Sequence, residues 1–372
     1  MKIAIVADWL TNQGGAENVV WDLLQAFPQA DLYTSIYNAE KLPQFAKYKP
    51  KTSFINNLPL AQKKHQLYLA LMPYAFESFD LSQYDVVISS SFACSKGVIT
   101  KPETLHLCYC HTPMRYVWGA YLDFINRYKL PKILKAMAKP LLHKIRIWDF
   151  VAAQRVDKFI ANSNYIKARI QKFYRADSIV LNPAIEQPIA DIQSIKGLES
   201  KDFYLAIGRL TSHKRFDIII KAFNQTKQTL VIAGQGDILS DLKKLNTNPN
   251  THFVGFVSKQ QRAWLYSQAK ALIFPQVEDL GIVPIEAQSY GCSIIALNKG
   301  GILDSIEDGV SGVLFENQTA DSLIQAIHKH SQMQFNKQLI KKNASRFYQS
   351  EFQAKIKEIV TLAYDAHKQI YS

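Results

Sequence analysis

Two glutamates, Glu278 and Glu286, stand eight positions apart in the stretch FPQVEDLGIVPIEAQSYGCSIIALNKGG, residues 274–301. This spacing is expected to place one carboxylate on a loop and the other in the first turn of the helix that follows. Carboxylates in this arrangement can accept hydrogen bonds from one polar ligand that carries several hydroxyl groups. A solvated loop and a Glu that complements the helix dipole are the ordinary alternative, so other residues must support the interpretation.

A helix start lies between the two glutamates. Pro284 suits a first helical turn, because its missing N–H would be unpaired there, and Gly291 suits the left-handed residue that ends a helix. The pattern predicts a helix over residues 283–290. Its free amides, preceded by the small residue Gly281, form a positive pole against which a phosphate can bind.

Arg209 precedes the loop LTSHKR and Lys214 lies within it; the loop joins an apolar, strand-like run to a segment with helical periodicity. Two cations on one strand-to-helix loop can together neutralise a diphosphate, because Arg offers a planar fork and Lys a point charge. A pair of exposed cations without a ligand is the alternative.

Several apolar runs end beside these polar residues. FYLAIGR ends at Arg209, TLVIAGQGD ends in Gly234-x-Gly236, and ALIFP precedes Glu278. The carboxyl ends of strands in an open α/β sheet line one edge, where ligands bind. We therefore expect one ligand site that contains Arg209, Lys214, Gly234, Glu278 and Glu286.

In the first half of the chain, two glycines and a histidine are the candidates. Gly14 and Gly15 lie between the apolar run of residues 2–7 and a helix-like segment, where glycines let a ligand approach backbone amides. The pattern G-x-G-x-x-G is absent, so a nicotinamide cofactor has little support. His111 follows the strand-like run TLHLCYC, and at a strand's carboxyl end it could face a cleft or be structural.

The chain's organisation indicates two α/β domains. Its 372 residues exceed one ordinary core, and apolar runs alternate with helix-length segments, which predicts doubly wound parallel sheets. We expect a first domain over 1–185, a connection near 183–201, a second domain over 201–350 and a long amphipathic helix over 351–372. No apolar stretch is long enough for a membrane span and MKIAIVADWL is typical of a first strand, so we expect a cytoplasmic protein.

The cysteines do not indicate a disulfide framework or a metal site. Four cysteines are too few and too scattered for such a framework. Cys108, Cys110 and His111 are close in sequence, but in a strand His111 would point to the other face, and no second pair of ligands is evident.

Positive charge is concentrated in one region. The net charge is +13, and residues 127–175 contain 13 Lys or Arg against Asp149 and Asp157. Basic and apolar residues alternate there, which suggests helices with one cationic and one apolar face. Such a surface could meet anionic lipid or nucleic acid, or be an ordinary solvated face. The aromatic-rich segment 67–81 favours core packing, with an apolar acceptor surface as the alternative.

Arg209-x4-Lys214, Glu278-x7-Glu286 and Gly14-Gly15 together resemble the retaining family-4 glycosyltransferases of GT-B fold. The resemblance covers essentially the whole chain. SSSFACSKGVIT, CYCHTPMRYVW, LHKIRIWDFVAAQRVDKFIANSNY and EDLGIVPIEAQ look like the branch that includes bacterial O-antigen and exopolysaccharide mannosyltransferases. The resemblance implies two Rossmann-like domains that face a central cleft, acceptor-binding first and nucleotide-sugar-binding second, with the last helix packing back on the first. Two departures are Ser293, where a proline is expected, and Asp304, where a glutamate is usual.

The resemblance also implies roles for the candidate residues. Arg209 and Lys214 would hold the donor diphosphate, Glu286 the ribose hydroxyls and Glu278 the donor sugar, which His111 would reach from the first domain. The following residues would complete the donor site: Gly14, Gly15, Gly234, Gly281, Ile282 and Val283.

The implied reaction needs no metal or other cofactor, because cations and amides would stabilise the leaving nucleoside diphosphate. The expected donor is GDP-mannose and the expected acceptor a polyprenyl-diphosphate-linked glycan, in bacterial surface polysaccharide synthesis. The basic region would then hold the enzyme peripherally on the anionic inner leaflet of the cell membrane. A UDP-sugar-dependent transferase, a GT-B sugar-nucleotide epimerase and a basic nucleic-acid-binding protein are the alternatives; the last leaves both glutamates unexplained.

Overall fold

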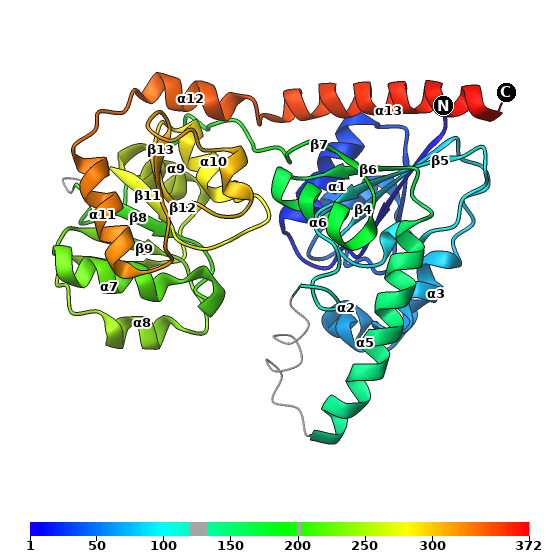
Figure 1. The fold of residues 1–372 in the computed structure, drawn as a ribbon, viewed down its shortest axis with the longest axis horizontal. Coiled ribbons are helices and arrows are strands. Elements are labelled where there is room, and N and C mark those ends of the chain that lie inside the picture. The colour runs from blue at the N-terminus through cyan, green and yellow to red at the C-terminus, as the bar shows by residue number, and fades with distance from the viewer. Residues whose placement is uncertain (120–131, 199–201, 372) are drawn as a thin grey trace. The chain divides into compact units, whose positions relative to one another are not determined.

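The computed structural model describes residues 1–119, 132–198 and 202–371, without the side chains of 132–137, and it forms two compact units. The first unit contains Met1–Ala184 and Ser350–Ser372, and the second contains Ile185–Gln349 (Figure 1). Each unit has its own parallel sheet, so the expected α/β fold with two Rossmann-like sheets is confirmed.

The first unit is built on a seven-stranded parallel sheet in the order β3-β2-β1-β4-β5-β6-β7. The direction in which strands are added reverses between β1 and β4, and in sheets of this kind ligands bind at such a switch point. The strands are β1 Ile3–Ala7, β2 Asp31–Thr34, β3 Lys51–Thr52, β4 Val86–Ser91, β5 Leu105–Cys110, β6 Lys158–Ala161 and β7 Ser178–Val180.

Helices cover both faces of this sheet. They are α1 Gly15–Ala26, α2 Ala61–Lys64, α3 Met72–Glu77, α5 Lys132–Ala153, α6 Asn164–Tyr174 and α13 Gln349–Tyr371, with 3-10 turns η1 Pro43–Tyr48, η2 Phe54–Asn57, η3 His65–Tyr68 and η4 Ser95–Gly97. One core places α1 and α13 against β1, and another places α3 and α5 on the opposite face.

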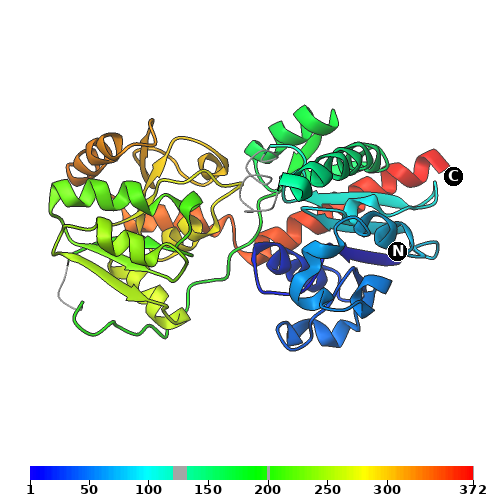
Figure 2. The same cartoon turned by 90° about the horizontal axis from the view of Figure 1, so that it is seen from below.

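Nearly the whole of the long helix α13 belongs to the first unit, which also contains Met1 (Figure 2). Phe352, Ile356 and Val360 recur every four residues and are buried, because this spacing gives the helix one apolar stripe. The ring of Phe352 meets that of Tyr109 on β5, with 6.0 Å between centroids.

A buried ionic network fixes α5. Lys96 in η4 pairs with Asp149, which also accepts hydrogen bonds from Trp118 Nε1 at 2.7 Å and the Tyr174 hydroxyl at 2.8 Å. Burial by itself would lower the pKa of Lys96, but the Asp149 charge outweighs it and leaves that pKa raised. Asp149 is therefore contacted by side chains from η4, from α6 and from the turn after β5. These contacts fix α5 against the rest of the unit.

The second unit has a six-stranded parallel sheet in the order β10-β9-β8-β11-β12-β13. Its strands are β8 Tyr204–Ile207, β9 Leu230–Ala233, β10 Thr251–Gly255, β11 Ala271–Phe274, β12 Ser293–Leu297 and β13 Gly312–Phe315. Its helices are α7 Phe216–Thr226, α8 Leu239–Leu245, α9 Lys259–Gln268, α10 Ile282–Ser289, α11 Ala320–Ser331 and α12 Lys337–Ser345, with 3-10 turns η5 Ser212–Lys214 and η6 Gly301–Asp304.

Local structure differs from the sequence-based prediction at the start of α10. Gly281, with φ of +96°, is the N-cap of α10, so the helix begins one residue early and Glu286 lies in its second turn; the prediction that Glu286 lies in the first turn was wrong. The basic region forms two helices on either side of β6, as expected: α5, which continues past Pro140, and α6; its residues 127–131 lie outside the described residues.

The segment after Ala184 lies along the second unit. Ile189 N–H donates to the Tyr290 hydroxyl at 3.0 Å, and Gln193 N–H donates to the Gln260 carbonyl at 3.2 Å. Among the helices within the described ranges, none combines the length and apolar character that crossing a membrane would require.

Candidate active site

The candidate residues of the second unit gather at the carboxyl ends of β8 and β11 and around the start of α10. Arg209 follows β8 and is exposed, Lys214 ends η5, and Glu278 lies on the loop after β11. Lys214 Nζ and Glu278 Oε1 form an ion pair, which the sequence did not predict. The two side chains remain 21% and 24% exposed, so a ligand can reach both.

Glycines shape the backbone that carries Glu278. Gly301 N–H donates to the Glu278 carbonyl at 2.9 Å. A Cβ on Gly301 would lie 1.9 Å from the Asp279 carbonyl oxygen, and Gly300 has φ of +96°. The Gly300-Gly301 turn therefore packs directly beneath the loop, which only residues without a side chain permit.

The first amides of α10 are available for an anion. Gly281 precedes them without a side-chain cap, and the N–H groups of Ile282 and Val283 have no partner within the helix. A Cβ on Gly281 would stand 3.3 Å from Phe274 and Ile302, so this corner is also closely packed. A helix start with free amides can bind a phosphate group.

Glu286 is held by α9. Its Oε2 accepts a hydrogen bond from the Tyr266 hydroxyl at 3.2 Å and lies 3.9 Å from Arg262 Nη1. Burial raises the pKa of Glu286, and the Arg262 charge opposes that rise. Glu286, Arg262 and Tyr266 line a small hollow together with Glu186 and Tyr290. The sequence analysis missed Arg262 and Tyr266; their four-residue spacing on one helical face is the signal that could have indicated them.

Gly234 directly follows β9, where the backbone after β8 approaches closely. It has φ of +134°, and a Cβ on it would lie 1.9 Å from the Gly208 carbonyl oxygen. Gly208 N–H donates to the Ala233 carbonyl at 3.0 Å, and Arg209 comes next in the chain. These contacts give Gly234 a packing role. Because it packs against Gly208, it positions the loop that begins with Arg209.

His111 follows β5 in the first unit and is buried. Its Nε2 is 2.8 Å from Ser90 Oγ at the end of β4, and the Tyr109 and Phe92 rings meet it edge-on. Burial lowers the pKa of His111 to about 3, so the imidazole is neutral at physiological pH. A neutral imidazole can exchange hydrogen bonds but carries no charge toward a ligand.

Gly14 and Gly15 open α1 beside two carboxylates that the sequence analysis missed. Asp8, directly after β1, accepts backbone N–H groups from Phe92, Ala93, Cys94 and Ser95 at 2.6–2.8 Å. Glu17, in the first turn of α1, is also buried. Asp8 thereby fixes the loop after β4 to the end of β1, next to the glycines.

The cysteines form no disulfide. All four are free and buried, and no group of three His, Cys, Asp or Glu side chains within the described residues is placed to hold a metal ion. In the second unit, Ser293 starts β12, where its hydroxyl donates to the Lys270 carbonyl at 2.9 Å and lies 2.7 Å from His330 Nε2. The unexpected serine therefore has a packing role away from the candidate site.

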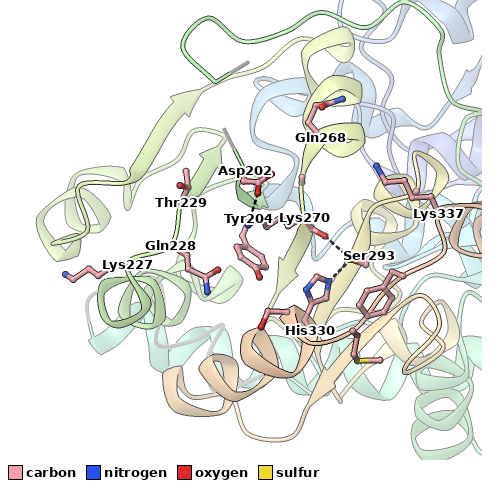
Figure 3. A pocket seen from close by; sticks show the side chains of 15 residues that line it. Asp202, Tyr204, Lys227, Gln228, Thr229, Gln268, Lys270, Ser293, His330 and Lys337 are labelled. Atoms are coloured by element: carbon pink, nitrogen blue, oxygen red, sulfur yellow. Dashed lines mark hydrogen bonds and ion pairs between the residues drawn. The ribbon is translucent and has the colours of Figure 1, made fainter. Parts of the chain in front are cut away.

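A large hollow of about 760 Å³ opens around His330, at the amino-terminal edge of the second sheet (Figure 3). Tyr204, Lys270 and Ser293 reach it from the beginnings of β8, β11 and β12. Ligands of open parallel sheets bind at the opposite, carboxyl edge. Because none of the predicted site residues lines this hollow, we do not assign it as the active site.

Comparisons with known proteins agree with this architecture. The family model described as glycosyltransferase family 4 matches residues 13–185, and the one described as glycosyl transferases group 1 matches residues 189–347. An alpha-1,3/1,6-mannosyltransferase ALG2 of Kluyveromyces lactis is 24% identical over 364 residues, which are 79% of this chain and 69% of that protein. The human ALG2 is 28% identical over 279 residues, or 63% of this chain and 62% of that protein.

A further relative is an uncharacterized 41.2 kDa protein in the cps region of Klebsiella pneumoniae, 27% identical over 214 residues, or 54% of this chain and 58% of that one. The chain thus spans between about half and seven tenths of the length of such relatives.

Solved structures share the fold. The apo lipopolysaccharide outer core galactosyltransferase WaaB has a TM-score of 0.68 at 17% identity, covering 97% of this chain and 99% of that one. Anabaena HepE in complex with UDP has a TM-score of 0.69 at 16% identity, covering 97% of this chain and 100% of that one. The two matched models together cover both units, and the sheets and neighbours have the GT-B architecture. The chain therefore belongs to the family-4, group-1 glycosyltransferases of GT-B fold.

Proposed function

We propose that this glycosyltransferase transfers mannose from GDP-mannose, with retention of anomeric configuration, to a lipid-linked glycan in bacterial surface polysaccharide synthesis. Mannose is supported by the ALG2 mannosyltransferases among its relatives, at 23–28% identity. Surface polysaccharide is supported by the relative from a cps region and by the sequence resemblance. The observation that carries the proposal is the gathering of cations, free amides and Glu278 at one sheet edge.

The residues at this sheet edge each have a role in the proposed reaction. Arg209 and Lys214 bind the diphosphate, and the amides of Ile282 and Val283 stabilise the charge that develops on it as it leaves. The Lys214–Glu278 ion pair keeps both side chains in place before a donor binds. When the diphosphate attracts Lys214, Glu278 becomes available to accept hydrogen bonds from the sugar hydroxyls.

No metal or cofactor is part of the proposal. The positive charges of Arg209 and Lys214 and the dipole of α10 supply the electrostatic stabilisation that a divalent ion would supply elsewhere. Glu286, held by Tyr266 and Arg262 on α9, is the proposed partner of the ribose hydroxyls. A carboxylate with one hydrogen bond from Tyr266 keeps further lone pairs for such a ligand.

We further propose that the first unit binds an anionic membrane surface, where a lipid-linked acceptor would be found. Large apolar side chains that include Leu67 and Tyr74 are exposed near Lys63 and Lys64 on α2, η3 and α3. On α5, Lys144, Ile147 and Val151 share one exposed face, and Trp148 Nε1 donates to Glu77 of α3 at 2.8 Å. Mixed basic and apolar surfaces of this kind bind anionic interfaces.

Flotation with phosphatidylglycerol vesicles tests the membrane proposal. The double variant Lys63→Glu and Lys64→Glu should lose vesicle binding, whereas Lys342→Glu, an exposed charge reversal in the second unit, should not. Binding to neutral phosphatidylcholine vesicles that equals binding to anionic ones would contradict the proposal.

Thermal unfolding with GDP, UDP, ADP or no ligand tests the donor proposal. A nucleotide at a hundred times its Kd should add about 2.7 kcal/mol of stability. We expect stabilisation by GDP that is lost in Arg209→Ala, because the exposed Arg209 would contact only the ligand. Stabilisation by UDP instead would contradict the mannose assignment, and no response to any nucleotide would contradict the donor site.

A UDP-sugar donor is the second candidate, because HepE, a neighbour in fold, was solved with UDP-glucose. Product analysis with both sugar nucleotides separates the candidates. A product formed without any acceptor would indicate an epimerase.

A further inference from the structure

The hollow of about 760 Å³ at the amino-terminal edge of the second sheet lies wholly within the second unit (Figure 3). Its walls come from the beginnings of β8, β11 and β12, from the loop after α7 and from the segment that joins α11 to α12. Pockets that bind small molecules have volumes of about 300–1,000 Å³. The hollow therefore has room for a small ligand, and its lining residues indicate which kind.

Tyr204, the first residue of β8, presents a hydroxyl group to this hollow. The residue is only 2% exposed, and its backbone N–H donates to the Thr229 carbonyl at 3.0 Å. Its hydroxyl, however, has no hydrogen-bond partner among the described residues. Figure 3 shows this hydroxyl pointing into the space between Gln228 and His330. Buried hydroxyl groups normally have a partner, and a ligand in the hollow can supply one.

His330, near the end of α11, contributes a hydrogen-bond acceptor beside Tyr204. Burial lowers the pKa of His330 to about 4, so the ring is neutral at physiological pH. The Ser293 hydroxyl donates its single proton to the Lys270 carbonyl, so His330 Nε2, 2.7 Å from Ser293 Oγ, must be the donor in that contact. The other ring nitrogen, Nδ1, is then an acceptor, and it is buried without a partner in the part of the chain that the structure describes.

Three lysines line the same hollow. Lys227 follows α7, Lys270 precedes β11 and Lys337 is the first residue of α12, so separate segments bring the positive charges together. Among the described lining residues Asp202 is the one carboxylate, and it pairs with Lys270 at 3.1 Å. Lys227 and Lys337 form no ion pair within the described ranges. Exposed lysines by themselves are ordinary, but these border two buried polar groups that lack partners.

We propose that this hollow is a second ligand site, which binds a phosphorylated sugar. The three lysines bind the phosphate group, and sugar hydroxyls form hydrogen bonds with the Tyr204 hydroxyl and His330 Nδ1. A neutral sugar would leave the lysines without an anion. An anion without hydroxyl groups would leave His330 Nδ1 unpaired, because that atom can only accept.

The second site is independent of the proposed donor site. Tyr204 begins β8, whereas Arg209 follows the end of the same strand, so the two residues lie at opposite edges of the sheet. A ligand in the hollow therefore does not need Arg209, and a nucleotide at the donor site does not need the lysines of the hollow.

Isothermal titration calorimetry with mannose 6-phosphate, glucose 6-phosphate, mannose and inorganic phosphate tests the second site on the full chain. Tyr204→Phe removes the hydroxyl alone, and a double variant carries Lys227→Gln and Lys337→Gln. Its matched control carries Lys221→Gln and Lys342→Gln, which change two exposed lysines on α7 and α12 outside the hollow. Arg209→Ala tests whether the same ligand binds at the donor site. Thermal unfolding without ligand establishes that each variant is folded.

At least one hexose phosphate should bind the wild-type protein about tenfold or more tightly than mannose or inorganic phosphate does, since it alone satisfies both the lysines and the hydrogen-bonding groups. The double variant Lys227→Gln and Lys337→Gln should weaken this binding about tenfold or more, because it removes two charged partners of the phosphate. Tyr204→Phe should weaken it about 3–10-fold, as expected for one neutral hydrogen bond. The matched control and Arg209→Ala should stay within about twofold of wild type.

Three results would overturn the second site. Neither hexose phosphate might exceed inorganic phosphate in affinity, the lysine double variant could bind as wild type does, or Arg209→Ala could abolish binding and so place the ligand at the donor site. If Tyr204→Phe fails to fold, the lysine double variant decides, because both of its lysines are exposed. Binding of a hexose phosphate in the hollow by a protein that no nucleotide stabilises would contradict the proposed function and leave the second site intact.

Discussion

Replacing Glu17 by glutamine should stabilise the protein at alkaline pH, although it removes a charged side chain. Glutamine keeps the shape of the side chain and a carbonyl oxygen that can accept the backbone N–H at the start of α1. It cannot ionise, so the buried site never holds a negative charge. The effect should therefore depend on pH, and its sign follows from the direction in which folding moves the pKa of Glu17.

The pKa of Glu17 rises from an ordinary 4.5 to about 7 because of burial and the Asp8 charge. Between these values the folded protein holds the proton while the unfolded chain releases it, so the free energy of unfolding falls as pH rises. At about 1.4 kcal/mol per pKa unit, the loss is about 3 kcal/mol once pH exceeds 7. Glu17→Gln escapes this loss, so its advantage should be small near pH 4.5 and about 3 kcal/mol at pH 8.5.

Urea unfolding at about pH 5 and pH 8.5 measures the difference, with Glu40→Gln as the control. Glu40 is exposed, so its replacement should leave the free energy of unfolding nearly unchanged at both values. A Glu17→Gln variant that is less stable than wild type at pH 8.5, or an advantage that does not grow with pH, would refute the reasoning. It would mean that the folded protein stabilises the Glu17 charge.

Three further outcomes follow from the structure. Lys96→Met should lower the free energy of unfolding, measured in urea, by about 3–5 kcal/mol, because it leaves the Asp149 charge buried without its cation. A loss below about 1 kcal/mol would contradict the buried ionic network. Gly301→Ala should abolish nucleotide-induced thermal stabilisation by displacing the loop at Asp279, and unchanged stabilisation would contradict that packing. The imidazole NMR signals of His111 should stay constant from about pH 5.5 to pH 8.5, since its pKa is about 3; a transition there would show that the ring is less buried.

Elements of the fold were predictable where residue pattern and local geometry agree. Pro284 and Gly291 bracketed α10 to within one residue, since a missing N–H and a left-handed backbone are local requirements. The capping residue Gly281 shifted the start, because Gly281 adopts its positive φ under a closely packed Phe274 and Ile302, which no local pattern reveals. Glu286 moved to the second turn for that reason.

The candidate site was likewise predictable in part from the sequence and in part only from the tertiary structure. The sequence by itself determined that Arg209, Lys214 and Glu278 follow strands of one parallel sheet, because apolar periodicity orders the strands and the parallel arrangement collects their carboxyl ends at one edge. The Lys214–Glu278 pair joins loops that are 64 residues apart, and only folding brings them together.

Only the tertiary structure distinguished the roles of the two carboxylates near β1, Asp8 and Glu17. Asp8 and Glu17 are both acidic residues near the first strand in the sequence, and their spacing gives no difference in role. In the fold, four amides from the loop after β4 satisfy Asp8, while Glu17 is buried without a side-chain partner among the described residues. The free energy of a buried charge depends on which donors surround it, and those donors come from distant parts of the chain.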